Sequence, residues 1–399
     1  MLEKILNTLC CPLCKSELIL KAFVEESRDL SLDKTAPSLS KEIVAKSSHR
    51  KIKEGVLLCS QCKVYYPIYS YVPVMLVFET DFHRKFIKEN VQQLNLIPDY
   101  KIPNGSPYPG EKSVQETFSD QWHMVEESEL SFAYTSEELK LLNQKVWLRW
   151  LEHSRENVKN ILNAGCGMGR EAVALQEVSN LAEIYAIDLN FSLFKGAELF
   201  KEHQGINFII ASLFNLPFKP SAFDLVYSQG VIHHTFSTYE AFKSIATYVR
   251  KEGYLFIWVY ALEDHLVRRG IVGIILRLMY LVESIVRPII SRSPKFLRDI
   301  IFGILTLIFY PIDKVVMLNS EKWELKNTNH ALRDWLSPRY AFRHSYNEVL
   351  EWFEDMDFKI IDIQSPRNYR QLFNKRLWGI GLTGNKVKDK GETESSCKI

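Results

Sequence analysis

A glycine-rich heptapeptide in the middle of the chain has the composition of a ligand-binding turn. Its residues are Asn163, Ala164, Gly165, Cys166, Gly167, Met168 and Gly169. An apolar segment before it, residues 158–162, predicts a strand, and residues 170–178 after it predict a helix. Glycine adopts the torsions of such a turn cheaply and lets the backbone approach a ligand closely. The heptapeptide therefore indicates a nucleotide site, although any tight turn of an α/β domain could use similar residues.

A carboxylate stands at the end of the next predicted strand. Residues 183–187 form a second apolar segment, and Asp188 follows it, nineteen residues after Gly169. A carboxylate at this place can accept hydrogen bonds from both hydroxyls of a ribose. Enzymes that bind dinucleotides share this feature, so Asp188 predicts a ribose without selecting the class of nucleotide.

The segments that follow distinguish between nucleotide-binding families. Residues 208–218 have the sequence Phe-Ile-Ile-Ala-Ser-Leu-Phe-Asn-Leu-Pro-Phe, and residues 223–234 have Phe-Asp-Leu-Val-Tyr-Ser-Gln-Gly-Val-Ile-His-His. With the glycine turn, this series resembles the class I S-adenosylmethionine-dependent methyltransferases of the type 11 group, which includes quinone methyltransferase-like proteins. The resemblance covers residues 155–262 and the C-terminal segment. It implies an α/β fold with a Rossmann-like, doubly wound, seven-stranded methyltransferase sheet.

The resemblance also implies a site for S-adenosylmethionine. The residues expected to contact this cofactor are Asn163, Gly165, Cys166, Gly167, Gly169, Asp188, Ser212, Leu213, Gln229 and Gly230. The residues of the turn would line the methionine and ribose part, and Asp188 would hold the ribose. Residues 212–213 would lie beside the adenine, and residues 229–230 would face the transferable methyl group.

Three places depart from the family pattern. Asn163 stands where many members have an acidic residue near the methionine ammonium, and Ser212 stands where an aspartate often accepts from the adenine amine. Lys251 and Glu252 replace a Pro-Gly pair that usually precedes Gly253. Amide and hydroxyl oxygens can still accept hydrogen bonds. We therefore expect the cofactor to bind, with lower affinity than is usual for the family.

Two Cys-x-x-Cys pairs near the N-terminus have the spacing of metal ligands. The four cysteines are Cys11, Cys14, Cys59 and Cys62. Both thiolates of a pair can reach one tetrahedral zinc, and two pairs complete a closed structural site; redox or disulfide cysteines are the alternative. With their flanking residues, which include Cys10-Cys11-Pro12-Leu13-Cys14, the pairs resemble the small zinc-ribbon family whose stand-alone members activate tRNA and protein methyltransferases. This resemblance covers residues 1–78.

Length and composition are those of an enzyme with more than one part. A chain of 399 residues exceeds the usual size of a single core. The net charge of +2 argues neither for nor strongly against nucleic acid, whose readers tend to concentrate basic charge. The weak basic content and the bulky apolar insertion at 263–338 together count against nucleic acid as a partner. The first residues are too polar for an export signal, and paired cysteines in such a chain favour a reducing compartment. We therefore expect a cytoplasmic protein.

The predicted organisation has five parts. They are a zinc ribbon at 1–78 with a mobile polar insert at 25–54, a linker and helical extension at 79–154, a methyltransferase core at 155–262 and 339–385, a helical insertion after strand five at 263–338, and a disordered tail at 386–399. In the extension, Phe118 and Trp122 have helical i, i+4 spacing. They would either close over the cofactor or pack in a core.

The insertion contains two apolar stretches. In the first, apolar residues recur every three or four positions, and Arg277, Glu283 and Arg287 fall on the opposite face, which predicts an amphipathic helix. The apolar residues are Ile271, Ile274, Ile275, Leu278, Val282, Ile285 and Ile289. The second stretch, residues 300–312, has no charge, and neither stretch has the about 20 apolar residues of a membrane span. The insertion is predicted to be either a lid packed on the core or a peripheral contact with a membrane surface.

Methyl transfer needs few catalytic side chains, because the sulfonium already carries the leaving group. The protein aligns the reactants and removes a proton where the acceptor requires it. The candidate bases are His233, His234, Tyr260 and His344, each with a structural role as the alternative. Arg339 and Arg343 have the chemistry to bind an anionic acceptor.

The pattern favours an S-adenosylmethionine-dependent methyltransferase that acts on a small molecule or a lipid- or sugar-linked precursor. A zinc-ribbon RNA methyltransferase is one alternative, and a catalytically silent scaffold with the same fold is another. The sequence makes no prediction of oligomeric state.

Overall fold

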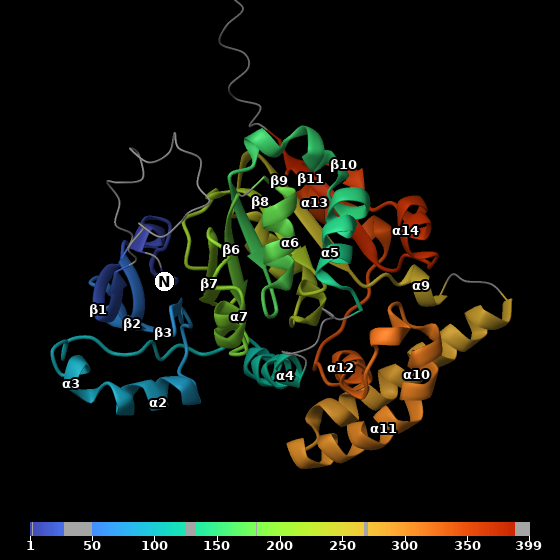
Figure 1. Cartoon of the computed structure of the whole chain (residues 1–399), viewed down its shortest axis with the longest axis horizontal. Helices are drawn as coiled ribbons and strands as arrows, with labels where there is room; N and C mark the ends of the chain where they lie inside the picture. The colour runs from blue at the N-terminus through green and yellow to red at the C-terminus, as the bar shows by residue number, and fades with distance from the viewer. Residues whose placement is uncertain (2, 28–49, 125–132, 181, 267–269, 388–399) are drawn as a thin grey trace, which may run out of the picture.

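The fold places a small ribbon, a large α/β core and a helical insertion in one chain (Figure 1). The computed structural model describes residues 1, 3–27, 50–124, 133–180, 182–266 and 270–387. The predictions of a mobile insert and a disordered tail fall mainly on residues 28–49 and 388–399, which lie outside the described residues.

The N-terminal ribbon is a four-stranded antiparallel sheet in the order β1-β2-β3-β4. After a short helix, Glu3–Asn7, its strands are β1 (Ile19–Ser27), β2 (Arg50–Cys59), β3 (Val64–Tyr69) and β4 (Val72–Pro73). Helices α2 (Asp81–Glu89), α3 (Val91–Leu94), α4 (Glu111–Met124) and α5 (Ser136–Leu142) follow, and α5 continues as a π-helical turn, Asn143–Trp147.

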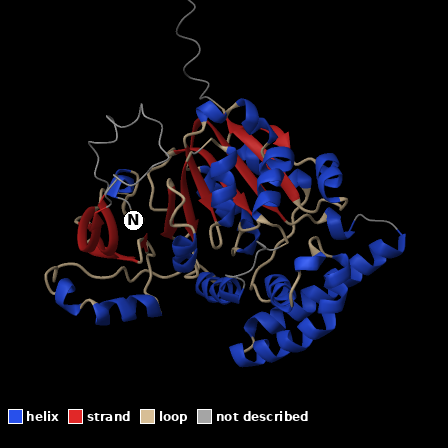
Figure 2. Cartoon of the chain, viewed as in Figure 1, coloured by secondary structure: helices blue, strands red, loops and turns tan. Residues whose placement is uncertain are grey.

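The core is a mixed sheet of seven strands in the order β10-β11-β9-β8-β5-β6-β7, in which β11 is antiparallel to both neighbours. Its strands are β5 (Asn160–Ala164), β6 (Glu183–Asp188), β7 (Ile206–Ile210), β8 (Phe223–Gln229), β9 (Val249–Val259), β10 (Phe358–Ile363) and β11 (Ile380–Lys386). The helices are α6 (Arg170–Val178), α7 (Leu193–Leu199), α8 (Thr238–Ala246), α13 (Tyr346–Asp355) and α14 (Pro366–Phe373). Helices cover the sheet, as apolar parallel strands require (Figure 2). The predicted fold class is confirmed.

One strand boundary differs from the sequence-based prediction. The strand expected at 158–162 forms at Asn160–Ala164. Its inner residues pair with both β6 and β8, so Asn163 is a central strand residue and not part of the turn. The helix predicted at 170–178 forms over the same residues as α6.

The ribbon packs against the β7 side of the core (Figure 1). Side chains from both parts, including Ile5, Leu9 and Phe218, belong to one buried cluster. The backbone N–H of Cys10 donates to the carbonyl of Pro217 at 2.8 Å, and the N–H of Met75 donates to that of Ile210 at 2.7 Å. Backbone hydrogen bonds and shared apolar burial therefore fix the ribbon to the core.

The insertion is helical, as predicted. It contains α9 (Glu263–Leu266), α10 (Gly270–Arg292), α11 (Lys295–Val316) and α12 (Leu325–Leu336). Helix α12 lies between the core and the pair α10 and α11 (Figure 1). Within the described part of the chain, no helix is long and apolar enough to cross a membrane.

Candidate functional site

The glycine turn and Asp188 form one end of a cavity of about 410 Å³ at the carboxyl ends of the central strands. Among the predicted site residues, its lining includes Gly165, Cys166, Gly167, Asp188, Leu213, Gln229, Gly230, His234 and Tyr260. The other predicted residues, Asn163, Gly169, Ser212, His233 and His344, are outside the lining. Chain folding thus brings together most of the turn, the ribose candidate and two of the four candidate bases.

Neighbouring side chains require the glycines of this turn. Gly165 and Gly167 have φ values of +87° and +57°, which L side chains rarely adopt. A Cβ on Gly165 would lie 2.4 Å from the side chain of Val231, and one on Gly167 would lie 2.5 Å from the ring of Trp122. Both neighbours line the cavity. The turn therefore keeps its backbone close to the side chains that would surround a ligand.

Asp188 is held in place by backbone donors. Its Oδ2 accepts from the N–H of Gly167 at 2.8 Å, and its Oδ1 accepts from the N–H of Asn190 at 2.9 Å. Burial raises the pKa of this carboxyl, while the hydrogen bonds from Asn190 and Gly167 oppose the shift. Each carboxylate oxygen can accept further hydrogen bonds. The site therefore fits a ligand with two adjacent hydroxyls, as a ribose has.

Two carboxylates that sequence reasoning missed also line the cavity, Glu171 on α6 and Glu111 on α4. Burial, and after it the charge of Asp188, raises the pKa of Glu171 to about 8. Glu111 is hydrogen-bonded to Ser212 and to the N–H of Tyr108, and burial raises its pKa. Glu111 can thus supply the acidic group that the family pattern places at 212, and Glu171 adds a second acidic group to the cavity.

Asn163 itself is fully buried, and its amide atoms have no hydrogen-bond partner within the described residues. The position of Glu171, two residues after the turn, is a signal that sequence reasoning could have used. No local signal could have found Glu111, because only the docking of α4 brings it to the cavity.

Helix α4 covers the part of the cavity that lies next to the loop after β6. Phe118 and Trp122 both contribute to the lining. The side-chain amide of Gln115 donates to the carbonyl of Leu189 at 2.9 Å, and the hydroxyl of Ser119 accepts from the N–H of Phe191 at 3.1 Å. These bonds hold α4 across the residues that follow Asp188.

His234 has the tautomer of a general base. Its Nδ1 lies 2.9 Å from the carbonyl of Tyr340, and because a carbonyl only accepts, Nδ1 carries the proton of the neutral ring. Nε2 then has a free lone pair, and it has no hydrogen-bond partner among the residues that the structure describes. Burial lowers the pKa of His234, so the ring is neutral at physiological pH.

The other candidate bases are placed less favourably. The Tyr260 hydroxyl donates to Asp334 at 3.1 Å, and burial raises its pKa well above 10.0. His233 is buried outside the cavity lining, where its ring packs on that of Tyr260 at 3.9 Å between centroids. His344 is also outside the lining, with Nδ1 at 2.8 Å from Glu348 and Nε2 at 2.8 Å from the hydroxyl of Thr238. These contacts are structural.

Helix α12 contributes two residues that the sequence did not suggest, His330 and Asp334, which line the cavity one turn apart. The ring of His330 packs on Trp122, with 5.3 Å between centroids. Arg343, predicted to bind an anionic acceptor, donates instead to both carboxylate oxygens of Glu283, at 2.8 and 2.6 Å. The remaining wall is rich in aromatic side chains, including Tyr134, Phe236, Trp258, Tyr369 and Trp378.

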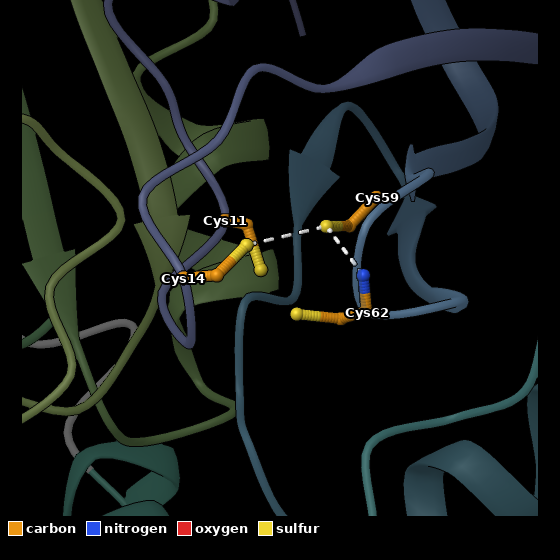
Figure 3. Close-up of side chains that lie close together, drawn as sticks. All are labelled: Cys11, Cys14, Cys59 and Cys62. Atoms are coloured by element: carbon orange, nitrogen blue, oxygen red, sulfur yellow. Dashed lines mark hydrogen bonds between the residues drawn. The ribbon is translucent and has the colours of Figure 1, made fainter.

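The four predicted metal ligands meet in the ribbon (Figure 3). The sulfur atoms of Cys11, Cys14, Cys59 and Cys62 all lie within 4.8 Å of one another. Four thiolates in this arrangement fit one tetrahedral zinc and leave no position for a substrate. None of the four lines the cavity, so this zinc would be structural.

The seven-stranded sheet, the ligand cavity at the strand ends and the four-cysteine cluster together define a Rossmann-like methyltransferase fold joined to a zinc ribbon. Residues 162–257 match the family described as "Methyltransferase domain", and residues 3–69 match "Trm112p-like protein". The chain thus contains a methyltransferase domain and a Trm112p-like domain. Both predicted resemblances are confirmed, and with them the predicted cofactor, S-adenosylmethionine, and the structural zinc.

The chain is 32% identical over 129 residues to the probable tRNA methyltransferase 9B of Mus musculus. That match covers 31% of this chain and 27% of the relative, so the chain spans about a quarter of the length of this curated relative.

Two solved structures are also similar. A complex between the Haloferax volcanii Trm112 methyltransferase activator and the putative methyltransferase is 13% identical, with a TM-score of 0.38 over 69% of this chain and 98% of that chain. The 1,6-didemethyltoxoflavin-N1-methyltransferase of Burkholderia thailandensis is 14% identical, with a TM-score of 0.38 over 72% and 92%.

Proposed function

We propose that this protein transfers the methyl group of S-adenosylmethionine to an acceptor bound in the cavity. The observation that carries the proposal is the placement of the glycine turn, Asp188 and His234 around one cavity. The methyltransferase domain over residues 162–257 supports the same reaction.

S-adenosylmethionine supplies an electrophilic methyl group when it is bound. Asp188 would hold the ribose hydroxyls, and Glu171, which stays protonated below a pH of about 8, would accept a hydrogen bond from the methionine ammonium at its carbonyl oxygen. His234 would accept the acceptor's proton at Nε2 while Nδ1 keeps its hydrogen bond to the Tyr340 carbonyl. The aromatic walls would exclude water and align the acceptor, which is most of what methyl transfer asks of a protein.

RNA is the acceptor class that the comparisons favour. The chain joins its methyltransferase domain to a Trm112p-like domain, and one relative is named as a probable tRNA methyltransferase. An aromatic cavity also suits a nucleobase that is turned out of its stack. This evidence favours RNA over the small-molecule acceptor expected from the sequence, and it weighs against the prediction that nucleic acid is not a partner.

A hydrophobic or lipid-linked acceptor is the second candidate. It is favoured by the apolar, aromatic character of the cavity. The same aromatic residues would bind a planar or hydrophobic molecule without a nucleic acid.

Transfer of a radiolabelled methyl group from S-adenosylmethionine into fractionated cell extract tests the reaction and the acceptor together. The proposal predicts label that depends on the protein, is lost in His234→Ala and becomes soluble after ribonuclease treatment. Label in the lipid fraction would support the second candidate. If the cofactor binds but no fraction gains label, the chain is a silent scaffold and the proposed activity is wrong.

A further inference from the structure

The helices α10 and α11 expose many apolar side chains and bury several charged ones, which include Glu283, Arg287 and Asp313. On α10, six apolar residues with helical spacing expose from 54% to 78% of their surface: Ile271, Ile274, Leu278, Val282, Ile285 and Ile289. A helix packed on a protein core shows the opposite arrangement. The interpretation of this helix as a lid with its apolar face on the core is therefore wrong for these six residues; the side chain of Ile275 is outside the described residues.

Helix α11 repeats this arrangement. Its exposed apolar residues include Ile300, Ile304, Leu307, Ile308, Ile312 and Val315, each more than half exposed. Both helices pack their other side against α12, in a cluster that includes Ile290, Phe302 and Leu332. The two exposed faces, called the outer face below, thus lie on the sides of α10 and α11 that do not pack against α12.

The inner side of α10 holds a buried charged network. Glu283 is 2% exposed, and it accepts from Arg287, from the indole N–H of Trp335 at 2.7 Å and from Arg343. Arg287 also donates to the carbonyl of Trp335 at 2.8 Å. Burying charge is costly unless it is fully paired. Because Glu283 and Arg287 are paired with residues of α12 and of the segment after it, these contacts fix the side of α10 that faces inward.

The inner side of α11 is polar as well. The hydroxyl of Thr328 donates to Asp313 at 2.7 Å, and Arg333 donates to Asp299 at 2.8 Å. Each acidic residue of α10 and α11 is thus bonded to α12 or to the segment after it. Rotating either helix to hide its outer face would break these bonds and expose the partners unpaired.

The charges around the outer face favour an anionic surface. Between residues 270 and 316 the sequence has six Lys or Arg and three Asp or Glu, and the three acids are those with inward partners. Arg292, at the end of α10, is exposed, and so is Arg277 on the polar side of that helix. Lys295 is exposed as well, but it donates to Asp120 of α4 at 2.7 Å. An apolar helical face with basic residues beside it is typical of helices that lie in the headgroup region of a membrane.

We propose that the outer face docks the protein on the surface of an anionic phospholipid bilayer. The apolar residues of α10 and α11 enter the boundary between headgroups and acyl chains, and neither helix crosses it, in agreement with their hydropathy. The core remains in water on the other side of α12. This inference does not depend on which acceptor is methylated.

Sedimentation with vesicles tests the proposal. The vesicles are phosphatidylcholine with phosphatidylglycerol, at about 3 to 1, and phosphatidylcholine alone. The full chain should sediment with the anionic vesicles, and less so in high salt. The variant Ile274→Ser, Leu278→Ser, Ile285→Ser should lose more than about tenfold in vesicle affinity, because three apolar side chains that would enter the bilayer are removed. A second variant, Leu307→Ser with Ile308→Ser, should lose affinity through α11.

A matched control removes three exposed apolar residues elsewhere: Ile87→Ser in α2, Val91→Ser in α3 and Leu96→Ser after α3. This control should sediment like the wild type, and all variants should keep wild-type affinity for S-adenosylhomocysteine as a check of folding. The proposal is overturned if the wild type binds neither vesicle, if both outer-face variants bind like the wild type, or if the control loses as much affinity. A dimeric wild type that does not bind vesicles would also overturn the proposal if the outer-face variants were monomers. A second copy of the chain would then cover this face.

Discussion

The buried carboxyl of Glu171 should make the stability of the folded protein depend on pH. Burial disfavours its ionised form, so the folded protein keeps the proton up to a pH of about 8, while the unfolded chain releases it near 4.5. The contribution of Glu171 to the free energy of unfolding is therefore fully present below a pH of 4.5, and it is lost as the pH rises to about 8. An upper limit for the loss is about 5 kcal/mol, from about 1.36 kcal/mol for each pKa unit.

In the ligand-free protein, Glu171→Gln should abolish this loss. Urea unfolding at a pH of about 5 and of about 9 should show a smaller decrease for Glu171→Gln than for the wild type. Glu177→Gln, an exposed change on the same helix, serves as the control. Parallel pH profiles of the wild type and Glu171→Gln would contradict a buried, protonated Glu171.

His234 is the residue whose removal should separate catalysis from binding. His234→Gln should slow methyl transfer by about 10²- to 10⁴-fold, the usual contribution of a general base, and leave the affinity for S-adenosylhomocysteine nearly unchanged. Since burial lowers the pKa of His234, the wild-type rate should stay constant around pH 6.5 and fall only at more acidic pH. A rate that falls with an ordinary histidine pKa, or an active His234→Gln, would assign the base to another residue; His203→Gln is the control.

At the scale of residues, the sequence predicted the turn and Asp188 because their roles depend on short spacing. It could not choose among the candidate bases. His234 differs from His233 by the carbonyl of Tyr340, which is contributed from 106 positions away. Glu111 and His330 reach the cavity through the docking of helices, which leaves no local pattern in the chain.

At the scale of elements, α4 should act as a cover for the cofactor. Trp122→Ala removes the ring that lies against Gly167 and lines the cavity. The affinity for S-adenosylhomocysteine should fall by up to about tenfold, corresponding to about 0.5–1.5 kcal/mol for an aromatic contact. Glu116→Ala, an exposed change on α4, should have no effect. Equal affinity for Trp122→Ala and the wild type, measured by calorimetry, would limit α4 to a structural role.

The elements themselves were predictable where burial follows periodicity. Helix α6 and strand β6 agree with the apolar pattern because these elements bury their apolar residues. The pattern of α10 predicted a helix, but not the direction of its apolar face. That direction is set by Glu283, Arg287 and Arg343, whose pairing joins segments 60 residues apart.

At the scale of the whole molecule, zinc in the ribbon should stabilise the core. Side chains of both parts share one buried cluster, so loss of the metal should lower the melting temperature of the entire protein. The purified protein should contain about one zinc for each chain. Cys11→Ser with Cys62→Ser should remove it, whereas Cys10→Ser should retain it. A full equivalent of zinc in the double variant would place the ligands elsewhere.

The most direct test of the central claim is calorimetric titration of the full chain with S-adenosylhomocysteine, for the wild type and Asp188→Asn side by side. The wild type should bind one molecule of ligand, and Asp188→Asn should bind it more weakly by about 1.5–3 kcal/mol, the value of a hydrogen bond to a charged group. NAD should not compete. Equal affinity in both proteins would remove Asp188 from the site, and tight binding of NAD without binding of S-adenosylhomocysteine would contradict a methyltransferase cavity.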